Sequence, residues 1–186
     1  MDDNADIRER YERVARQFTD RVVAVPAEAW EAPAPCDGWV ARDVVGHLVE
    51  WLPAFFFGMW GIEGPAVPSV EDDPVAAWAA VDQAIRAALA DPAIAGAERD
   101  TPMGRKDFAS AIDMICTTDV LVHTWDLARA TGLDETLDPA EVHRYVEGME
   151  PIDELLRQSG QYGPRVPVPD DADEQTRLIG FLGRHP

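Results

Sequence analysis

Apolar residues recur at steps of three and four along nearly the whole chain, and this helical periodicity is the strongest constraint on its fold. No segment shows the sustained two-residue alternation of a half-buried strand, so we predict an all-α protein. The first apolar stripe predicts a helix of about five turns that is capped at Asn4 or Asp6 and closed by Pro26. Its members are Ile7, Tyr11, Val14, Phe18 and Val22.

Four further helical segments follow, near residues 40–53, 73–90, 107–130 and 139–159. The pairs Asp73-Pro74 and Asp138-Pro139 are typical of helix starts, and Gly132 is typical of a helix end. We expect loops at 26–38, from Gly58 to residue 64, and at 92–106, the last with room for a short extended piece. The fifth helix should bend at Pro151, and a short apolar turn at 178–182 should dock on the bundle. These elements predict a four-helix bundle with an additional C-terminal helix, as a single domain spanning 1–186.

Charge and composition exclude several classes of function. The 186 residues include 16 Lys and Arg against 35 Asp and Glu, a net charge of −19 that repels nucleic acid and anionic membrane surfaces. The apolar stretch 51–62 is too short for a transmembrane helix, which needs roughly 20 residues. The acidic N-terminus lacks the apolar core of a signal peptide, and two cysteines are too few for a disulfide framework. We therefore expect free thiols and a cytoplasmic location.

Two titratable residues lie on the apolar stripe of the segment 107–130. Asp119 and His123 are four residues apart, so their side chains neighbour each other on one helical face, with Asp126 close by. A buried carboxylate costs several kcal/mol unless it is paired or bound to a metal. Two interpretations fit this spacing: a neutral hydrogen bond inside the core, or a pair of ligands that bring one oxygen and one nitrogen to a single ion.

A third polar residue, His47, shares a stripe with Val44 and Trp51 on the segment 40–53. It is either a core histidine with satisfied hydrogen bonds or a further ligand. Two imidazoles and one carboxylate suit zinc, and also nickel or ferrous iron, and three protein ligands leave a position open for water or substrate. Sequence spacing alone does not connect His47 to the other two residues. We expect His143 to be a solvated or half-buried helix residue and His185 to be exposed.

Two segments resemble the motifs of a known family. Residues 36–48, CDGWVARDVVGHL, resemble the P-C-x-G-W-[ST]-x-x-D-[LV]-x-x-H-[LV] opening of the mycothiol-dependent maleylpyruvate isomerase N-terminal domain family. Residues 118–132, TDVLVHTWDLARATG, are similar to its second motif, E/D-x-x-x-H-x-W-D-L-A-x-A-x-G. The chain looks like the single-domain branch of this family.

The resemblance implies a DinB-like four-helix bundle with a divalent metal between its helices. Matched residue by residue, the ligands would be His47, Asp119 and His123, with zinc as the first expectation and mycothiol as a thiol co-substrate. The chain departs from the family at two residues, because Val40 replaces the usual Ser or Thr cap and Asp119 is shorter than the usual Glu. We also expect it to lack the C-terminal domain of the two-domain isomerase.

Three functional hypotheses follow. In the first, the metal activates a thiol or water for a transferase or isomerase acting on a small molecule, with Asp43 or Asp126 behind the ligands. Trp51, Trp125 and the aromatics of 55–60 would then wall the pocket, and Arg105 or Arg129 would meet a substrate carboxylate. In the second, the bundle holds a metal or a small molecule without turnover. In the third, the polar residues form a metal-free hydrogen-bonded cluster. A homodimer is compatible with the aromatic segment 51–60.

Overall fold

The computed structural model describes residues 3–101, 104–158 and 163–186 and is mostly helical. Its contacts divide the chain into two compact units. Unit 1 comprises Met1–Ala34 and Gly38–Glu135, and unit 2 comprises Pro35–Asp37 and Thr136–Pro186. Each unit is described by itself, and the expectation of a single domain over 1–186 stays a prediction. Within the described ranges, no helix is both long and apolar enough to cross a membrane.

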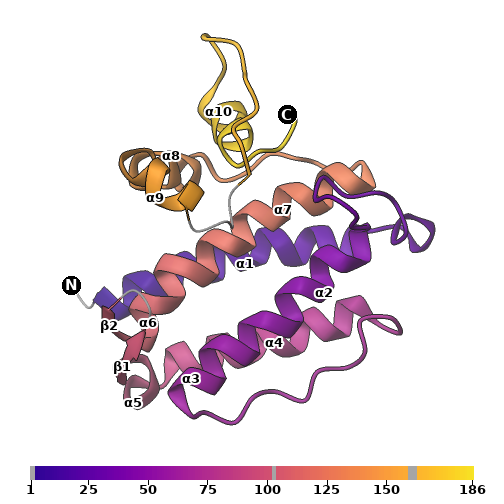
Figure 1. The fold of residues 1–186 in the computed structure, drawn as a ribbon. Helices are drawn as coiled ribbons and strands as arrows, with labels where there is room; N and C mark the ends of the chain where they lie inside the picture. Colours follow the sequence, from indigo (N-terminus) through magenta and orange to yellow (C-terminus); the bar gives the residue numbers. More distant parts are fainter. Residues whose placement is uncertain (1–2, 102–103, 159–162) are drawn as a thin grey trace. The chain divides into compact units, whose positions relative to one another are not determined.

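Unit 1 is a four-helix bundle built from α1 (Asp3–Ala24), α2 (Ala41–Leu52), α4 (Pro74–Ala90) and α7 (Thr117–Thr131). Helix α1 packs against α4 and α7, and α2 packs against the same two helices (Figure 1). Helices α1 and α2 therefore occupy opposite corners of the bundle. The all-α bundle predicted from the periodicity is confirmed, and the neighbouring pair α2 and α7 carries all three predicted ligands.

The core of unit 1 is formed by the predicted apolar stripes. Four members of the stripe on α1, from Tyr11 to Val22, are at most 1% exposed. Trp78 of α4 packs edge-on against Phe18 with ring centroids 4.7 Å apart, and its indole N–H donates to the Thr19 hydroxyl at 2.8 Å. An aromatic pair of this geometry adds about 1 kcal/mol beyond its buried area. The same contact also satisfies the polar atom of a buried tryptophan.

Several helix boundaries follow the predicted local signals, but the predicted cap of the first helix at Asn4 or Asp6 is wrong, because both residues lie inside α1. The Asp73 carboxylate accepts the N–H of Ala76 at 2.9 Å and caps α4. Gly132 ends α7 in the left-handed conformation at φ 70°, which favours glycine. The Val40 side chain does not cap α2. The Asp43 carboxylate accepts the Val40 N–H at 2.8 Å, which is one of the two hydrogen bonds of a capping box.

The chain after α2 remains helical further than predicted. A π-helical turn spans Pro53–Phe57, and helix α3 (Gly58–Trp60) continues it before Gly61 terminates the segment at φ 66°. The expected loop at Gly58 is therefore wrong, because the loop begins at Gly61. Proline has no N–H and its ring crowds the carbonyl four residues earlier, so a departure from regular α-helical geometry is expected at Pro53.

A second π-helical turn interrupts the segment predicted as one helix over 107–130. Helix α6 (Phe108–Ala111) leads into the π turn Ile112–Cys116, where Thr117 donates its N–H and its hydroxyl to the Ile112 carbonyl. A π turn adds one residue and rotates the following helix by about 100° relative to a regular α-helix. It therefore changes which face of α7 carries the buried side chains.

The loop before α6 contains the extended piece that the sequence allowed. Helix α5 (Pro92–Ala95) is followed by an antiparallel pair, β1 (Glu98–Thr101) and β2 (Gly104–Asp107), in which Glu98 pairs with Asp107. Asp107 then caps α6 by accepting the Ser110 N–H at 2.8 Å.

Unit 2 contains α8 (Pro139–Met149), a 3-10 turn (Glu150–Ile152), α9 (Asp153–Gln158) and α10 (Glu174–Phe181). The break at Pro151 confirms the predicted bend, while the predicted helix end at 159 lies outside the described residues. Helix α10 packs on α8. That the segment 178–182 docks on the bundle stays a prediction.

Candidate metal centre

Three predicted ligands converge where α2 packs against α7. His47 lies in the middle of α2, and Asp119 and His123 lie one turn apart on α7. One donor atom from each residue can be chosen so that all three lie within 4.8 Å of one another. The structure thus supplies the connection to His47 that sequence spacing alone does not provide.

The distances within this group are longer than hydrogen bonds. Nε2 of His47 lies 3.5 Å from Oδ2 of Asp119, and Nε2 of His123 lies 3.6 Å from Oδ1. Hydrogen bonds of this type are about 2.7–3.2 Å long. Two ligand atoms bound tetrahedrally to one zinc ion at about 2.0–2.1 Å are about 3.3–3.4 Å apart. The spacing therefore fits ligands of a shared ion better than a hydrogen-bonded core pair.

Asp126 fixes the orientation of His123. Its Oδ2 lies 2.9 Å from Nδ1 of the imidazole, and the Asp126 carboxylate has no exposed surface. A proton held on Nδ1 leaves Nε2, the atom nearest Asp119, as the lone-pair donor. Carboxylate–histidine pairs of this kind orient the imidazoles that bind metals. Asp126 thus lies against His123 and Asp43 instead caps α2, while the role of His123 as a metal ligand stays a prediction.

Asp119 is held as an anion. Burial raises the pKa of this carboxyl group, but the neighbouring imidazoles of His123 and His47 and a hydrogen bond from Trp51 lower it more. The pKa of Asp119 therefore lies below its ordinary value. The indole N–H of Trp51 donates to Oδ2 at 2.9 Å. An ionised carboxylate between two imidazoles is the form that binds a cation.

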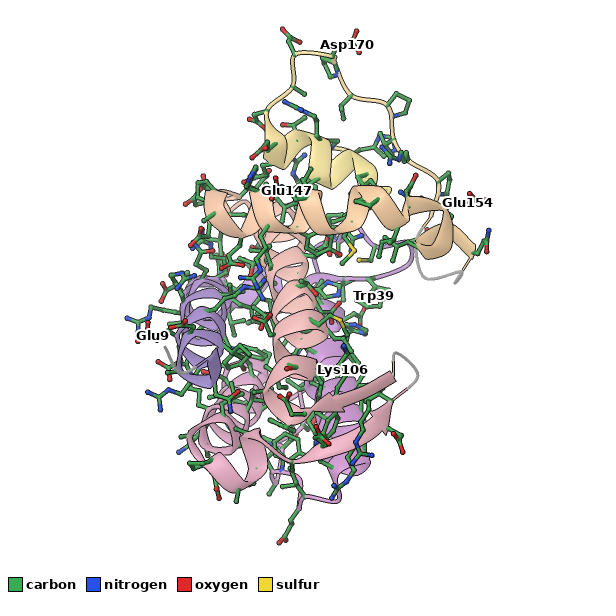
Figure 2. All side chains as sticks on the ribbon, turned by 90° about the vertical axis from the view of Figure 1, so that its left-hand side faces the viewer. Glu9, Trp39, Lys106, Glu147, Glu154 and Asp170 are labelled. Carbon is green, nitrogen blue, oxygen red and sulfur yellow. The ribbon has the colours of Figure 1, made fainter. Side chains whose placement is uncertain are left out.

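Indole rings surround the three donor residues. Trp39 lies 5.9 Å from His123 at an interplanar angle of 20° and 5.2 Å from His47, measured between ring centroids. Figure 2 labels Trp39 beside α7. Trp51 lies 5.9 Å from His47. Trp51 was predicted near the site, whereas the role of Trp39 was missed although this residue belongs to the first motif.

The centre is open on one side. The side chains of His47 and Asp119 are 32% and 26% exposed, while that of His123 is 7% exposed. The expectation that all three lie inside the core therefore holds best for His123. One buried imidazole beside two partly exposed ligand groups suits a metal site in which a water or substrate ligand can be exchanged.

The buried thiol near the site is a poor nucleophile. Burial raises the pKa of Cys116 well above its ordinary value, and the charges of Asp119 and Asp82 add to this effect. Cys116 therefore stays protonated and packs as an apolar side chain. Cys36 and Cys116 are not joined to each other in a disulfide, and the expectation of free thiols stays a prediction.

The two arginines proposed for a substrate carboxylate are engaged elsewhere. Arg105 pairs with Glu98 and Asp100 on the hairpin, at 2.8 and 3.5 Å. Arg129 pairs with Glu135 at 2.7 Å and lies over the ring of the buried Trp125. These contacts place neither guanidinium beside the three donors.

The other two histidines, His143 and His185, are exposed. His143 is exposed and contacts Glu174 and Glu147 at 2.9 and 3.5 Å, as expected for a surface residue. Hydrogen bonding to Glu174, together with the charges of Glu174 and Glu147, raises its pKa above the ordinary value.

Comparisons with known proteins identify the family whose first motif the segment 36–48 resembles. The family model for the mycothiol maleylpyruvate isomerase N-terminal domain matches residues 11–56, which include His47. Two uncharacterized proteins from different strains of Mycobacterium tuberculosis are each 30% identical over 176 residues, covering 94% of this chain and 95% of theirs. No solved structure matches the chain significantly.

Proposed function

This chain belongs to the mycothiol maleylpyruvate isomerase N-terminal domain family, whose members are DinB-like helical proteins, and on that premise we propose a metal- and thiol-dependent transferase or isomerase. The proposed ligands are His47, Asp119 and His123. Zinc is the first candidate, because two imidazoles and one carboxylate form a common catalytic zinc site, with nickel and ferrous iron as alternatives. The thiol would be mycothiol, and the electrophile a small molecule.

One observation supports this proposal above the others. Nε2 of His47 and Nε2 of His123 lie 3.5 and 3.6 Å from the oxygens of Asp119, which is longer than a good hydrogen bond and close to the spacing of two ligands on one zinc ion. Asp126 also presents the Nε2 lone pair of His123 toward the same point. This arrangement favours the metal hypothesis over a metal-free hydrogen-bonded cluster.

Each residue of the candidate metal centre has a distinct role in this proposal. A divalent ion, when bound, would lower the pKa of a coordinated thiol or water and so supply a nucleophile near neutral pH. Asp126 holds the proton on Nδ1 of His123 and keeps its imidazole fixed. The partly exposed His47 and Asp119 face the side from which a thiol enters, and the rings of Trp39 and Trp51 limit access of water there. We place this activity in the cytoplasm, where thiols stay reduced.

Metal analysis tests the binding step. Protein purified without an affinity tag or chelator should carry about one equivalent of a divalent metal. His47→Ala and His123→Ala should remove it, while His143→Ala, which alters an exposed histidine of unit 2, should not. A folded wild-type protein that stays metal-free after incubation with zinc would contradict the proposal.

A thiol assay tests turnover. Mycothiol is mixed with 1-chloro-2,4-dinitrobenzene to detect transfer, or with maleylpyruvate to detect isomerisation. The metal-loaded protein should accelerate one of these reactions, and the metal-free protein and the His123→Ala variant should not. Metal binding without any acceleration would instead support the non-catalytic bundle.

A further inference from the structure

The two oxygens of Asp119 have different surroundings. Oδ2 accepts the indole N–H of Trp51 at 2.9 Å, a separation typical of a good hydrogen bond. Oδ1 lies 3.6 Å from Nε2 of His123, too far for a hydrogen bond. Oδ2 thus accepts from Trp51 and also lies 3.5 Å from Nε2 of His47, whereas Oδ1 faces the buried imidazole of His123.

Trp51 is itself held in place by its neighbours. It lies one helical turn after His47 on α2, and the π turn that begins at Pro53 brings two rings against it. The centroids of Phe55 and Phe56 lie 5.7 and 5.9 Å from that of Trp51. The π turn thus helps to fix the direction of the indole N–H toward Asp119.

We infer that Trp51 is a positioning residue whose indole N–H holds the Asp119 carboxylate in the orientation that presents Oδ2 toward His47 and Oδ1 toward His123. This inference rests on the proposed function and deepens it. A free carboxylate can bind an ion through both oxygens. The hydrogen bond from Trp51 limits how the Asp119 carboxylate can turn, so the protein presents it in one orientation beside the two imidazoles.

Cobalt(II) is the probe, because its visible absorption is intense in four-coordinate sites and weak at higher coordination numbers. Trp51→Phe keeps an aromatic ring and removes the N–H. We expect Co²⁺ to bind this variant about 10- to 100-fold more weakly, the usual cost of losing a partner that orients a ligand. The absorption of the cobalt-saturated variant should also change, because the released carboxylate is no longer held in one orientation toward the ion.

Trp60→Phe is the matched control. The Trp60 N–H donates to the Ala97 carbonyl at 2.6 Å, and its ring packs against Phe108 rather than Asp119. This variant loses the same kind of hydrogen bond in the same unit and should bind Co²⁺ with wild-type affinity and spectrum. If Trp51→Phe is poorly folded by circular dichroism, benzothienylalanine at position 51 keeps the size of the ring system without the N–H.

The outcomes separate the two proposals. A wild-type protein that binds no Co²⁺ would overturn the proposed function, and this inference with it. A wild-type protein that binds Co²⁺, together with a position-51 variant of the same affinity and spectrum, would overturn only the role of Trp51.

Discussion

Replacement of Asp126 tests how the protein prepares His123 for metal binding. Asp126→Ala removes the acceptor that lies 2.9 Å from Nδ1, and Asp126→Asn keeps an amide oxygen there without the negative charge. Both positions are enclosed: the Asp126 side chain is 0% exposed and that of His123 is 7% exposed. Water therefore replaces the lost partner poorly.

The expected losses follow from this burial. Leaving the Nδ1–H of a buried imidazole without this acceptor costs about 1–3 kcal/mol of stability. Loss of a carboxylate behind a metal-binding histidine typically lowers metal affinity about 10- to 100-fold, which corresponds to about 1.4–2.7 kcal/mol. Asp126→Asn should lie between the wild type and Asp126→Ala in both quantities, because the amide oxygen still accepts the proton of Nδ1.

Two assays measure these quantities separately. Competition with a chromophoric chelator gives the zinc Kd of each variant, and urea denaturation of the metal-free proteins gives the free energy of unfolding. Wild-type zinc affinity in both variants would refute the role assigned to Asp126. A lower free energy of unfolding with unchanged zinc affinity would show that the Asp126 carboxylate stabilises the fold without contributing to metal binding.

Two further predictions concern local structure. Gly180→Ala would place a Cβ 2.7 Å from the Val166 carbonyl oxygen, so we expect a loss of about 1–3 kcal/mol in urea denaturation; Gly58→Ala, which meets no atom within 4 Å in a helical turn, should gain about 0.5–1 kcal/mol. Equal effects of these two changes would contradict the packing described. Glu174→Gln should lower the pKa of His143, measured by NMR titration, because Glu174 raises it through a hydrogen bond. The raised pKa means that this contact stabilises the fold below the ordinary histidine pKa and that its contribution is lost as the pH rises through the raised value; an unchanged titration would refute the pairing.

The helices could be predicted from the sequence because their signals are local. The cap at Asp73 and the left-handed Gly132 each depend on a few neighbouring residues, and both occur where expected. The two π turns were missed, because their residues carry the same apolar stripe as a regular helix. A proline at position 53 predicts a disturbance of the helix but does not specify which kind.

The candidate site also has a part that local sequence signals predict and a part that they do not. The neighbourhood of Asp119 and His123 follows from a spacing of four on one helix. The approach of His47, the hydrogen bond from Trp51 and the position of Trp39 depend on how α2 and its preceding loop pack against α7. Periodicity predicts which face of each helix is buried, but it does not predict which residues of two helices meet.

X-ray absorption at the zinc edge tests the central claim most directly. The account predicts that zinc-loaded protein, free of added thiol, shows only nitrogen and oxygen neighbours at about 2.0–2.2 Å, with the scattering pattern of two imidazoles. The pattern should lose one imidazole in His47→Ala and stay unchanged in His143→Ala. A sulfur neighbour at about 2.3 Å, or a pattern insensitive to His47, would contradict the assignment of His47, Asp119 and His123 as the ligands.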